Sequence, residues 1–287
     1  MGIIGHDRTV GDMERLAGSG ALGHGYILSG PSMVGKRTIA QAFGKFLEKG
    51  RFEAPTENEV LQDLKMIDSS FVRMLDPDAR GESIGIDAVR EIKGFLWQRP
   101  NVSSRRTVIV DNADTLTTEA QNALLKMTEE PPASSLLLLV TSDPDAILGT
   151  IRSRLPEVYF GTVPGSAIQE WLAGTGDAAI ADAASCAARA RGKPGLAWRF
   201  MHDAQFRAEL EQAERFLAAP AASRKDLIKK LIEPDDFSLR KFLEAITVVL
   251  ASKDPAPAAL WHKALRLSEN AGNFPLNPRL QLEALMR

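Results

Sequence analysis

A glycine-rich segment early in the chain has the spacing of a phosphate-binding loop. Gly30, Gly35 and Lys36 fit the pattern G-x-x-x-x-G-K, which follows an apolar run and precedes a helical one. In such loops, backbone N–H groups and a helix N-terminus face phosphate oxygens, and the lysine reaches further phosphates. The pattern therefore predicts a site for ATP or ADP, although a glycine turn without a ligand would have the same local sequence.

The residue after Lys36 departs from this pattern. That position normally carries a serine or threonine whose hydroxyl holds Mg²⁺. Here it is Arg37, and Thr38 follows one residue late. A shift of one residue on a helix turns the side chain by about 100°, so Thr38 is a poor substitute, although it remains a candidate nucleotide contact. We therefore expect binding of nucleotide rather than its hydrolysis.

An acidic residue, Asp111, ends the apolar run Thr107–Val110 and could coordinate metal-bound water. A hydrolysing ATPase has a carboxylate next, which polarises the attacking water. The amide of Asn112 can position water but cannot accept its proton. Asp and Asn are also common in strand-to-loop turns. We interpret the segment as both: a former catalytic corner that now serves structure.

Two arginines, Arg152 and Arg154, follow a second apolar run at Leu136–Val140. A guanidinium is always charged and can donate two parallel hydrogen bonds to a phosphate. On residue type alone, a pair of surface arginines in local salt bridges is the favoured interpretation.

The composition excludes several classes of protein. The chain has 287 residues with 44% hydrophobic content, enough for two or three packed domains. Its 35 basic and 37 acidic side chains give a net charge of −2, so no global basic field indicates nucleic-acid binding. The single cysteine, Cys186, excludes an internal disulfide and a cysteine-based zinc site. The first residues lack the features of a signal peptide, and no apolar run is long enough to cross a bilayer, so we expect a cytoplasmic protein.

The first 160 residues or so alternate short apolar runs with helical patterns, which predicts an α/β fold with a parallel sheet. Helices are expected at 36–49 and from a capping box at Thr118 and Gln121 to the stop at Pro131. The expected strands are Tyr26–Ser29, Phe71–Leu75, Thr107–Val110, Leu136–Val140 and Val158–Phe160.

The composition changes after residue 160, where the chain becomes helical throughout. We expect three domains, at 1–161, 162–202 and 203–287. The helical pattern of the second domain is broken at Gly192–Gly195, and the last domain is interrupted near Pro220, Pro234 and Pro255–Pro257.

Several motifs together resemble the delta-prime subunits of bacterial DNA polymerase III clamp loaders, which are AAA+ proteins. The most specific is Ala120–Lys126 followed by Glu129–Pro132. The others are His24–Pro31, Thr150–Arg154, Arg191–Ala197 and Leu276–Glu283. Two departures stand out. Leu155 replaces the cysteine of the family's Ser-Arg-Cys element, and the four-cysteine zinc module of many relatives cannot form.

The resemblance implies an AAA+ core, a small helical lid and an all-helical collar. It implies a non-hydrolysing stator in which Arg154 acts as an arginine finger on the ATP of a neighbouring motor subunit. Thr141 fits a nucleotide-sensing position, although its hydroxyl could equally satisfy a strand end. Gly195 stands where motor subunits carry another arginine. No cofactor is required, no zinc is expected, and ATP or ADP could occupy the loop.

The implied partners are gamma/tau-type motor subunits, a delta-type subunit, the sliding clamp and primed DNA, without a membrane. Arg90 matches a position that faces DNA, but it is equally typical of an exposed helix. Arg99, Arg105 and Arg106 could extend a basic patch or only aid solubility. Two alternatives remain: an ATP-hydrolysing gamma-type motor subunit, or a stand-alone P-loop NTPase.

Overall fold

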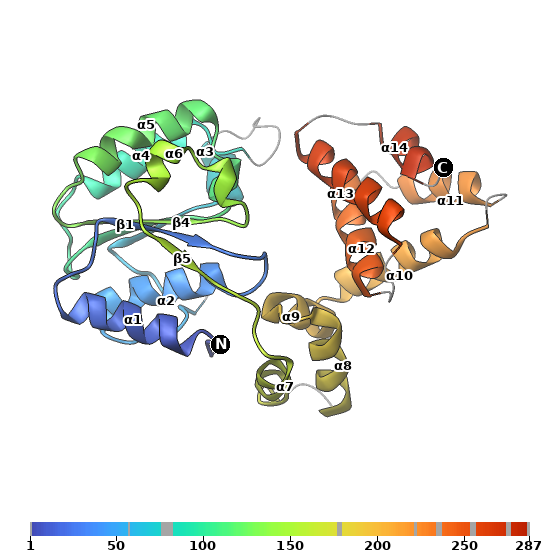
Figure 1. Ribbon diagram of the computed structural model, residues 1–287, viewed down its shortest axis with the longest axis horizontal. Coiled ribbons are helices and arrows are strands. Elements are labelled where there is room, and N and C mark those ends of the chain that lie inside the picture. The colour runs from blue at the N-terminus through green and yellow to red at the C-terminus, as the bar shows by residue number, and fades with distance from the viewer. Residues whose placement is uncertain are drawn as a thin grey trace. The chain divides into compact units, whose positions relative to one another are not determined.

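The computed structural model describes residues 2–56, 58–75, 83–176, 180–220, 223–233, 237–252, 257–273 and 277–285. Within these ranges, five parallel strands form one sheet in the order β2-β3-β4-β1-β5 (Figure 1). The strands are β1 Gly25–Ser29, β2 Leu64–Ile67, β3 Arg106–Val110, β4 Ser135–Val140 and β5 Glu157–Tyr159. Every residue of β3 and β4 is buried, as expected for strands covered on both faces.

Helices cover both faces of this sheet, and the strand order explains which face each one takes. The connection from β1 to β2 runs across the sheet in one direction, whereas those from β2 through β5 run in the other. Because crossovers between parallel strands are right-handed, the two sets of helices fall on opposite faces. Figure 1 shows α1 (Asp7–Gly18) and α2 (Lys36–Lys49) on one face, and α4 (Ile86–Leu96), α5 (Thr118–Glu129) and α6 (Gly149–Arg152) on the other.

The predicted strand at Phe71–Leu75 is wrong, because this segment lies in helix α3 (Ser69–Leu75). Asp68 starts that helix, since its carboxylate accepts hydrogen bonds from the backbone N–H groups of Ser70 and Phe71. The sheet position belongs instead to β2. That strand was missed because Lys65 interrupts its apolar run; its ammonium pairs with Glu91 at the sheet edge.

The cap of α5 is also displaced by one residue from its prediction. Thr117, not Thr118, caps the helix and accepts a hydrogen bond from the backbone N–H of Ala120 at 3.2 Å. The buried Gln121 side chain closes no capping box. It bonds three backbone groups instead, the carbonyls of Leu116 and Ala146 and the N–H of Leu148. Gln121 thereby ties α5 to the segment that enters α6.

The chain divides into two compact units, one up to Ala197 and one from Trp198. Helices α7 (Gly165–Ala173) and α8 (Ile180–Ala190) belong to the first unit, and α9 (Pro194–His202) spans the division. The boundary expected between 202 and 203 stays a prediction. The helical pattern is broken between α8 and α9, at 191–193; of the expected break at 192–195, Pro194 and Gly195 already belong to α9.

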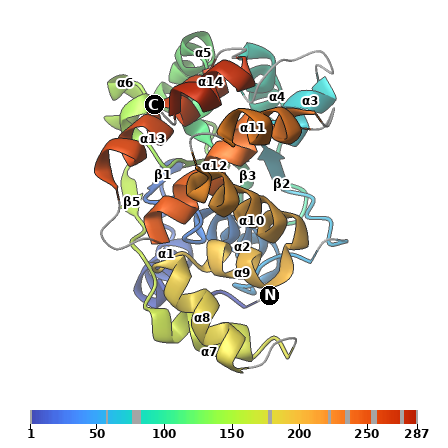
Figure 2. The same cartoon turned by 90° about the vertical axis from the view of Figure 1, so that its right-hand side faces the viewer.

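The second unit is helical, and α12 packs against both α10 and α13 (Figure 2). Its helices are α10 Ala204–Ala218, α11 Arg224–Ile232, α12 Leu239–Ser252, α13 Ala258–Asn273 and α14 Pro278–Leu285. The interruption expected near Pro220 falls between α10 and α11, whereas Pro234, Pro255 and Leu276 lie outside the described residues. Among the described residues, no helix combines the length and apolar character that a membrane span requires.

Candidate functional site: a phosphate loop at the carboxyl edge of the sheet

Three of the predicted nucleotide-binding segments meet at the carboxyl edge of the sheet. Gly30 follows β1, Asp111 follows β3 and Thr141 follows β4, so the three residues leave neighbouring strands at the same end. The chain leaves β1 toward one side of the sheet and β4 toward the other. Such a reversal between adjacent strands opens a crevice at their carboxyl ends, where ligands bind in open α/β sheets.

The loop after β1 requires glycine at its first position. Gly30 has φ of 130°, and a Cβ atom there would lie 2.1 Å from the backbone oxygen of Phe160. Gly35, with φ of 105°, immediately precedes α2, so the helix N-terminus faces the loop. Met33 also adopts a left-handed conformation, with φ of 64°. The predicted strand, loop and helix are therefore confirmed in place.

The loop lysine is bonded to its own loop. Lys36 is buried, and its Nζ donates hydrogen bonds to the backbone oxygens of Gly30 at 2.5 Å and Pro31 at 2.6 Å. Burial lowers the pKa of Lys36 to about 8, although the carboxylates of Asp114 and Asp111 oppose this shift. A phosphate would have to exchange for these two carbonyl contacts.

The lowered pKa of Lys36 gives a pH dependence of stability. Between about pH 8 and 10.5 the unfolded chain holds more protons at this residue than the folded chain, so the free energy of unfolding should rise with pH. Urea denaturation at about pH 7.5 and about pH 9.5 measures this slope. In Lys36→Met this part of the pH dependence should vanish. Lys93→Met, which also removes a lysine, is the control and should keep it. An unchanged slope in Lys36→Met would contradict the assignment.

Arg37, which replaces the usual serine or threonine of the phosphate loop, forms ion pairs with two carboxylates. Its Nη1 lies 3.0 Å from Oδ2 of Asp111, and its Nη2 lies 3.1 Å from Oδ2 of Asp68. Burial raises the pKa of Asp111 above its ordinary value, while the Arg37 guanidinium acts in the opposite direction. Thr38, one residue further along α2, is half-buried. Arg37 therefore lies beside Asp111, where the loop hydroxyl was expected.

The two other polar residues of this edge have structural contacts. Asn112 is exposed and left-handed, with φ of 52°, in the turn after β3. The Thr141 hydroxyl is buried within hydrogen-bonding distance of Oδ1 of Asp114 and the backbone of Asp143. These contacts match the strand-end role that the sequence left open for Thr141.

Two other segments lie against the phosphate loop. The backbone N–H of Gly195, at the start of α9, donates to the oxygen of Met33 at 3.0 Å. A Cβ at Gly195 would lie 3.2 Å from Met33, so a larger residue would crowd the loop. From the beginning of the chain, Nε2 of His6 lies 3.3 Å from the oxygen of Val34, and burial lowers the pKa of His6.

Arg154 lies in the turn after α6, with its side chain 36% exposed. Its Nη2 donates to Oε1 of Glu129 at 2.9 Å, and its Nη1 donates to the oxygen of Thr150 at 2.7 Å. Arg152 bonds a different acid, Asp145. The two arginines thus have separate partners, and the guanidinium of Arg154 remains accessible at the surface.

The basic side chains considered for a nucleic-acid patch divide into structural and exposed ones. Arg106 is buried and lies 3.5 Å from Asp63, while Arg105 donates to backbone carbonyls. These contacts favour a structural role for both side chains over a basic patch. Arg99 is exposed. Arg90 is also exposed, on α4, where it pairs with Asp87 one helical turn earlier.

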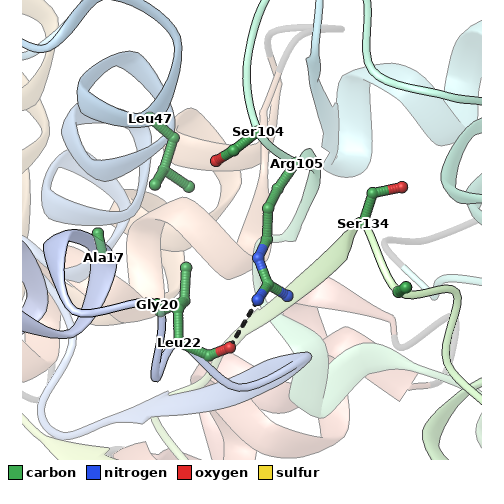
Figure 3. Close-up of a pocket in the computed structure, with 8 residues that line it drawn as sticks. Ala17, Gly20, Leu22, Leu47, Ser104, Arg105 and Ser134 are labelled. Carbon is green, nitrogen blue, oxygen red and sulfur yellow. Dashed lines mark hydrogen bonds between the residues drawn. The ribbon is translucent and has the colours of Figure 1, made fainter.

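A pocket of about 380 Å³ lies beside Arg105. Figure 3 shows the guanidinium of Arg105 directed at the oxygen of Leu22, to which it donates a hydrogen bond of 2.7 Å. The pocket is lined by Ala17, Gly20, Leu22, Leu47, Ser104, Arg105, Ala133 and Ser134. These residues lie near the amino ends of β1, β3 and β4, so the pocket is at the edge opposite the phosphate loop.

Sequence reasoning missed the partners of the site arginines. Asp68 escaped notice because β2, which it follows, was not recognised. The sequence indicates Glu129 only as part of a motif. Its pairing with Arg154 leaves no local signal, because the two residues are 25 positions apart in the chain. Among the described residues, no group of three or more His, Cys, Asp or Glu side chains could hold a metal ion.

The parallel sheet, the phosphate loop after β1 and the acid after β3 define a P-loop protein of the AAA+ class. A gamma subunit-related protein of DNA polymerase III from Thermotoga maritima has a similar fold, with a TM-score of 0.61 and 20% identity over 96% of this chain and 97% of that one. Residues 5–164 match the family model described as DNA polymerase III, delta subunit. The chain belongs to this family.

Relatives with curated descriptions include delta' and gamma/tau subunits. The chain is 32% identical to DNA polymerase III subunit delta' of Pseudomonas aeruginosa over 163 residues, 56% of this chain and 50% of that protein. It is 38% identical to subunit delta' of Escherichia coli over 98 residues, 34% and 29% of the two chains. Subunit gamma/tau of Mycobacterium tuberculosis is 30% identical over 176 residues, which cover 60% of this chain and 30% of that protein. The chain thus spans about half the length of the curated relatives it matches, or less.

Proposed function

We propose that this chain is a non-hydrolysing stator subunit of the DNA polymerase III clamp loader. In this role it would supply Arg154 as an arginine finger to the ATP of a neighbouring gamma/tau-type motor subunit. The other partners would be a delta-type subunit and the sliding clamp, with primed DNA reached through the assembled complex. No cofactor would be required, and ATP or ADP in the chain's own loop would not turn over.

The observation that carries this proposal is the contrast between two arginines. Arg37 lies within the chain's own phosphate site and pairs with Asp111 and Asp68. Arg154 instead presents a surface guanidinium, held by one exposed acid, Glu129. Because an exposed ion pair contributes little stability, its partner can be exchanged for a phosphate at small cost. The first arrangement opposes hydrolysis in the chain itself, and the second suits action on a neighbour.

The main rival is an ATP-hydrolysing gamma-type motor subunit, which the similarity to gamma/tau subunits favours. A stand-alone P-loop NTPase is the other. Three residues oppose both. Arg37 replaces the metal-binding hydroxyl, Asn112 cannot accept a proton from water, and Gly195 leaves no side chain toward the loop.

Two measurements on the full chain test the proposal. The isolated chain should show no Mg²⁺-dependent ATPase above background, whereas appreciable turnover would favour a rival. Mixed with gamma/tau-type and delta-type subunits, it should co-purify as one complex. Omitting it should abolish ATPase stimulated by clamp and primed DNA. A complete, active loader without this chain would contradict the stator role.

Arg90 carries a further proposal, that it contacts the phosphate backbone of DNA in the assembled loader. Phosphate contacts give affinity without reading sequence, and each released counterion adds to the salt dependence. Arg90→Ala should weaken binding to all primed DNA and reduce the slope of log affinity against log salt by about 1. The control is Lys49→Ala, an exposed cation on α2 at the other face of the sheet. An unchanged slope in Arg90→Ala would assign this arginine to its helix surface alone.

A further inference from the structure

The magnesium ion implied by the AAA+ class does not fit this site. P-loop NTPases hold Mg²⁺ with the hydroxyl that follows the loop lysine and with the acid that ends a neighbouring strand. Here the first ligand is replaced by Arg37, and the second, Asp111, accepts a hydrogen bond from that same arginine. One protein ligand of the metal is therefore absent, and the other is engaged by the residue that replaces it.

The sheet itself brings the two acids to one cation. Ile67 of β2 is paired with Val110 of β3, and the backbone N–H of Asp111 donates to the oxygen of Ile67 at 2.9 Å. The strands thus end at the same level, and Asp68 and Asp111 emerge side by side. Two adjacent carboxylates repel each other unless a cation lies between them.

Arg37 supplies that cation from the first turn of α2. Its two terminal nitrogens each reach one carboxylate, at 3.0 Å and 3.1 Å. The side chains of Asp111 and Asp68 are only 11% and 16% exposed, whereas that of Arg37 is 48% exposed. The acids are therefore largely shielded from solvent, and the more exposed group of the cluster is the guanidinium.

We propose that Arg37 is a permanent internal replacement for Mg²⁺, which closes the carboxylate pair of Asp111 and Asp68 to divalent cations. The guanidinium satisfies these acids at all physiological pH values, because it does not lose its proton. Both of its terminal nitrogens are engaged by the two carboxylates, so it would have to leave one of them to reach a phosphate with either nitrogen in its present orientation. The inference concerns the chain's own loop and does not depend on the stator role, so either can fail without the other.

Binding of Mn²⁺, which stands in for Mg²⁺ and is detected by electron paramagnetic resonance, tests this with the full chain. Arg37→Ser restores the hydroxyl and frees both carboxylates. We expect this variant to bind Mn²⁺ at least about tenfold more tightly than the wild-type chain. The gain should disappear in Arg37→Ser/Asp111→Asn, which locates the ion, and it should be absent from Arg37→Lys, which keeps a positive charge.

Equal Mn²⁺ affinity of the wild type and Arg37→Ser would overturn the proposal, as would a gain that survives Asp111→Asn. A thermal melt provides a second readout, in which Mn²⁺ should raise the melting temperature of Arg37→Ser and leave the wild type unchanged. If Arg37→Ser does not fold, the wild type decides the question. Saturable Mn²⁺ binding that Asp111→Asn removes would then refute the inference, and no such binding would support it.

Discussion

Replacing Arg154 with alanine should leave the proposed clamp-loader complex assembled and remove most ATP hydrolysis at the neighbouring motor site on which we propose that it acts. A trans arginine stabilises the negative charge that develops on the transferred phosphoryl group, and its loss costs about 10³-fold or more in rate. The side chain is exposed, and its ion pair with Glu129 is at the surface, so folding should be little affected. Single-turnover ATPase of the reconstituted loader, with clamp and primed DNA, measures the effect.

Arg152→Ala is the matched control for Arg154→Ala. It removes the same type of side chain two residues away, at the end of α6, but this arginine is paired with Asp145 rather than Glu129. We expect near wild-type hydrolysis and clamp loading from the control. Gel filtration of each reconstituted complex checks assembly. If Arg154→Ala assembles and hydrolyses ATP like the control, Arg154 is an ordinary surface arginine.

Gly30→Ala should unfold the nucleotide-binding core or destabilise it by at least about 3 kcal/mol. Two causes add together. The backbone of Gly30 has φ of 130°, which side chains rarely tolerate, and the new Cβ would lie 2.1 Å from the oxygen of Phe160. That oxygen is part of the backbone beside β1, so it cannot move without disturbing the junction of β1 and β5. Chemical denaturation followed by circular dichroism measures the loss.

The control for Gly30→Ala is Gly35→Ala in the same loop. Gly35 also has a left-handed backbone, with φ of 105°, but a Cβ there would have no other atom within 4 Å. This variant should lose only the conformational part, about 1–2 kcal/mol. Equal losses in the two variants would show that the close approach to Phe160 contributes nothing.

The elements of the core that the sequence predicted correctly have an uninterrupted signal. The strand Leu136–Val140 is apolar at every position, and the helix at 36–49 keeps its apolar spacing between Gly35 and Gly50. The strand β2 has no such signal, because Lys65 lies at the sheet edge and reaches Glu91. The neighbouring run Phe71–Leu75 is more apolar than β2, and the sequence therefore predicts the strand there. It is helical because the Asp68 carboxylate caps the first turn of α3.

The residues of the candidate site were found individually from their motifs, but their pairings were not. The departure at Arg37 was visible in the sequence, whereas its bridge between Asp111 and Asp68 depends on the register of β2 against β3. Ion pairs between residues distant in sequence leave no spacing pattern. Arg106 shows that a pattern can also mislead. It follows another basic residue in the sequence, as in a surface patch, but its side chain is buried beside Asp63.

The Arg154–Glu129 pair has a consequence for the helix that carries Glu129. Helix α5 ends at Glu129, so this carboxylate lies where the aligned peptide dipoles place partial negative charge. An acid is unfavourable there, and Arg154 compensates it. In the proposed finger role, the guanidinium would turn from Glu129 to a phosphate, and Lys126 would be left as the basic residue of the last turn of α5. Engagement with a neighbour's nucleotide would therefore weaken the last turn of α5, and the helix would report on the state of a site outside its own chain.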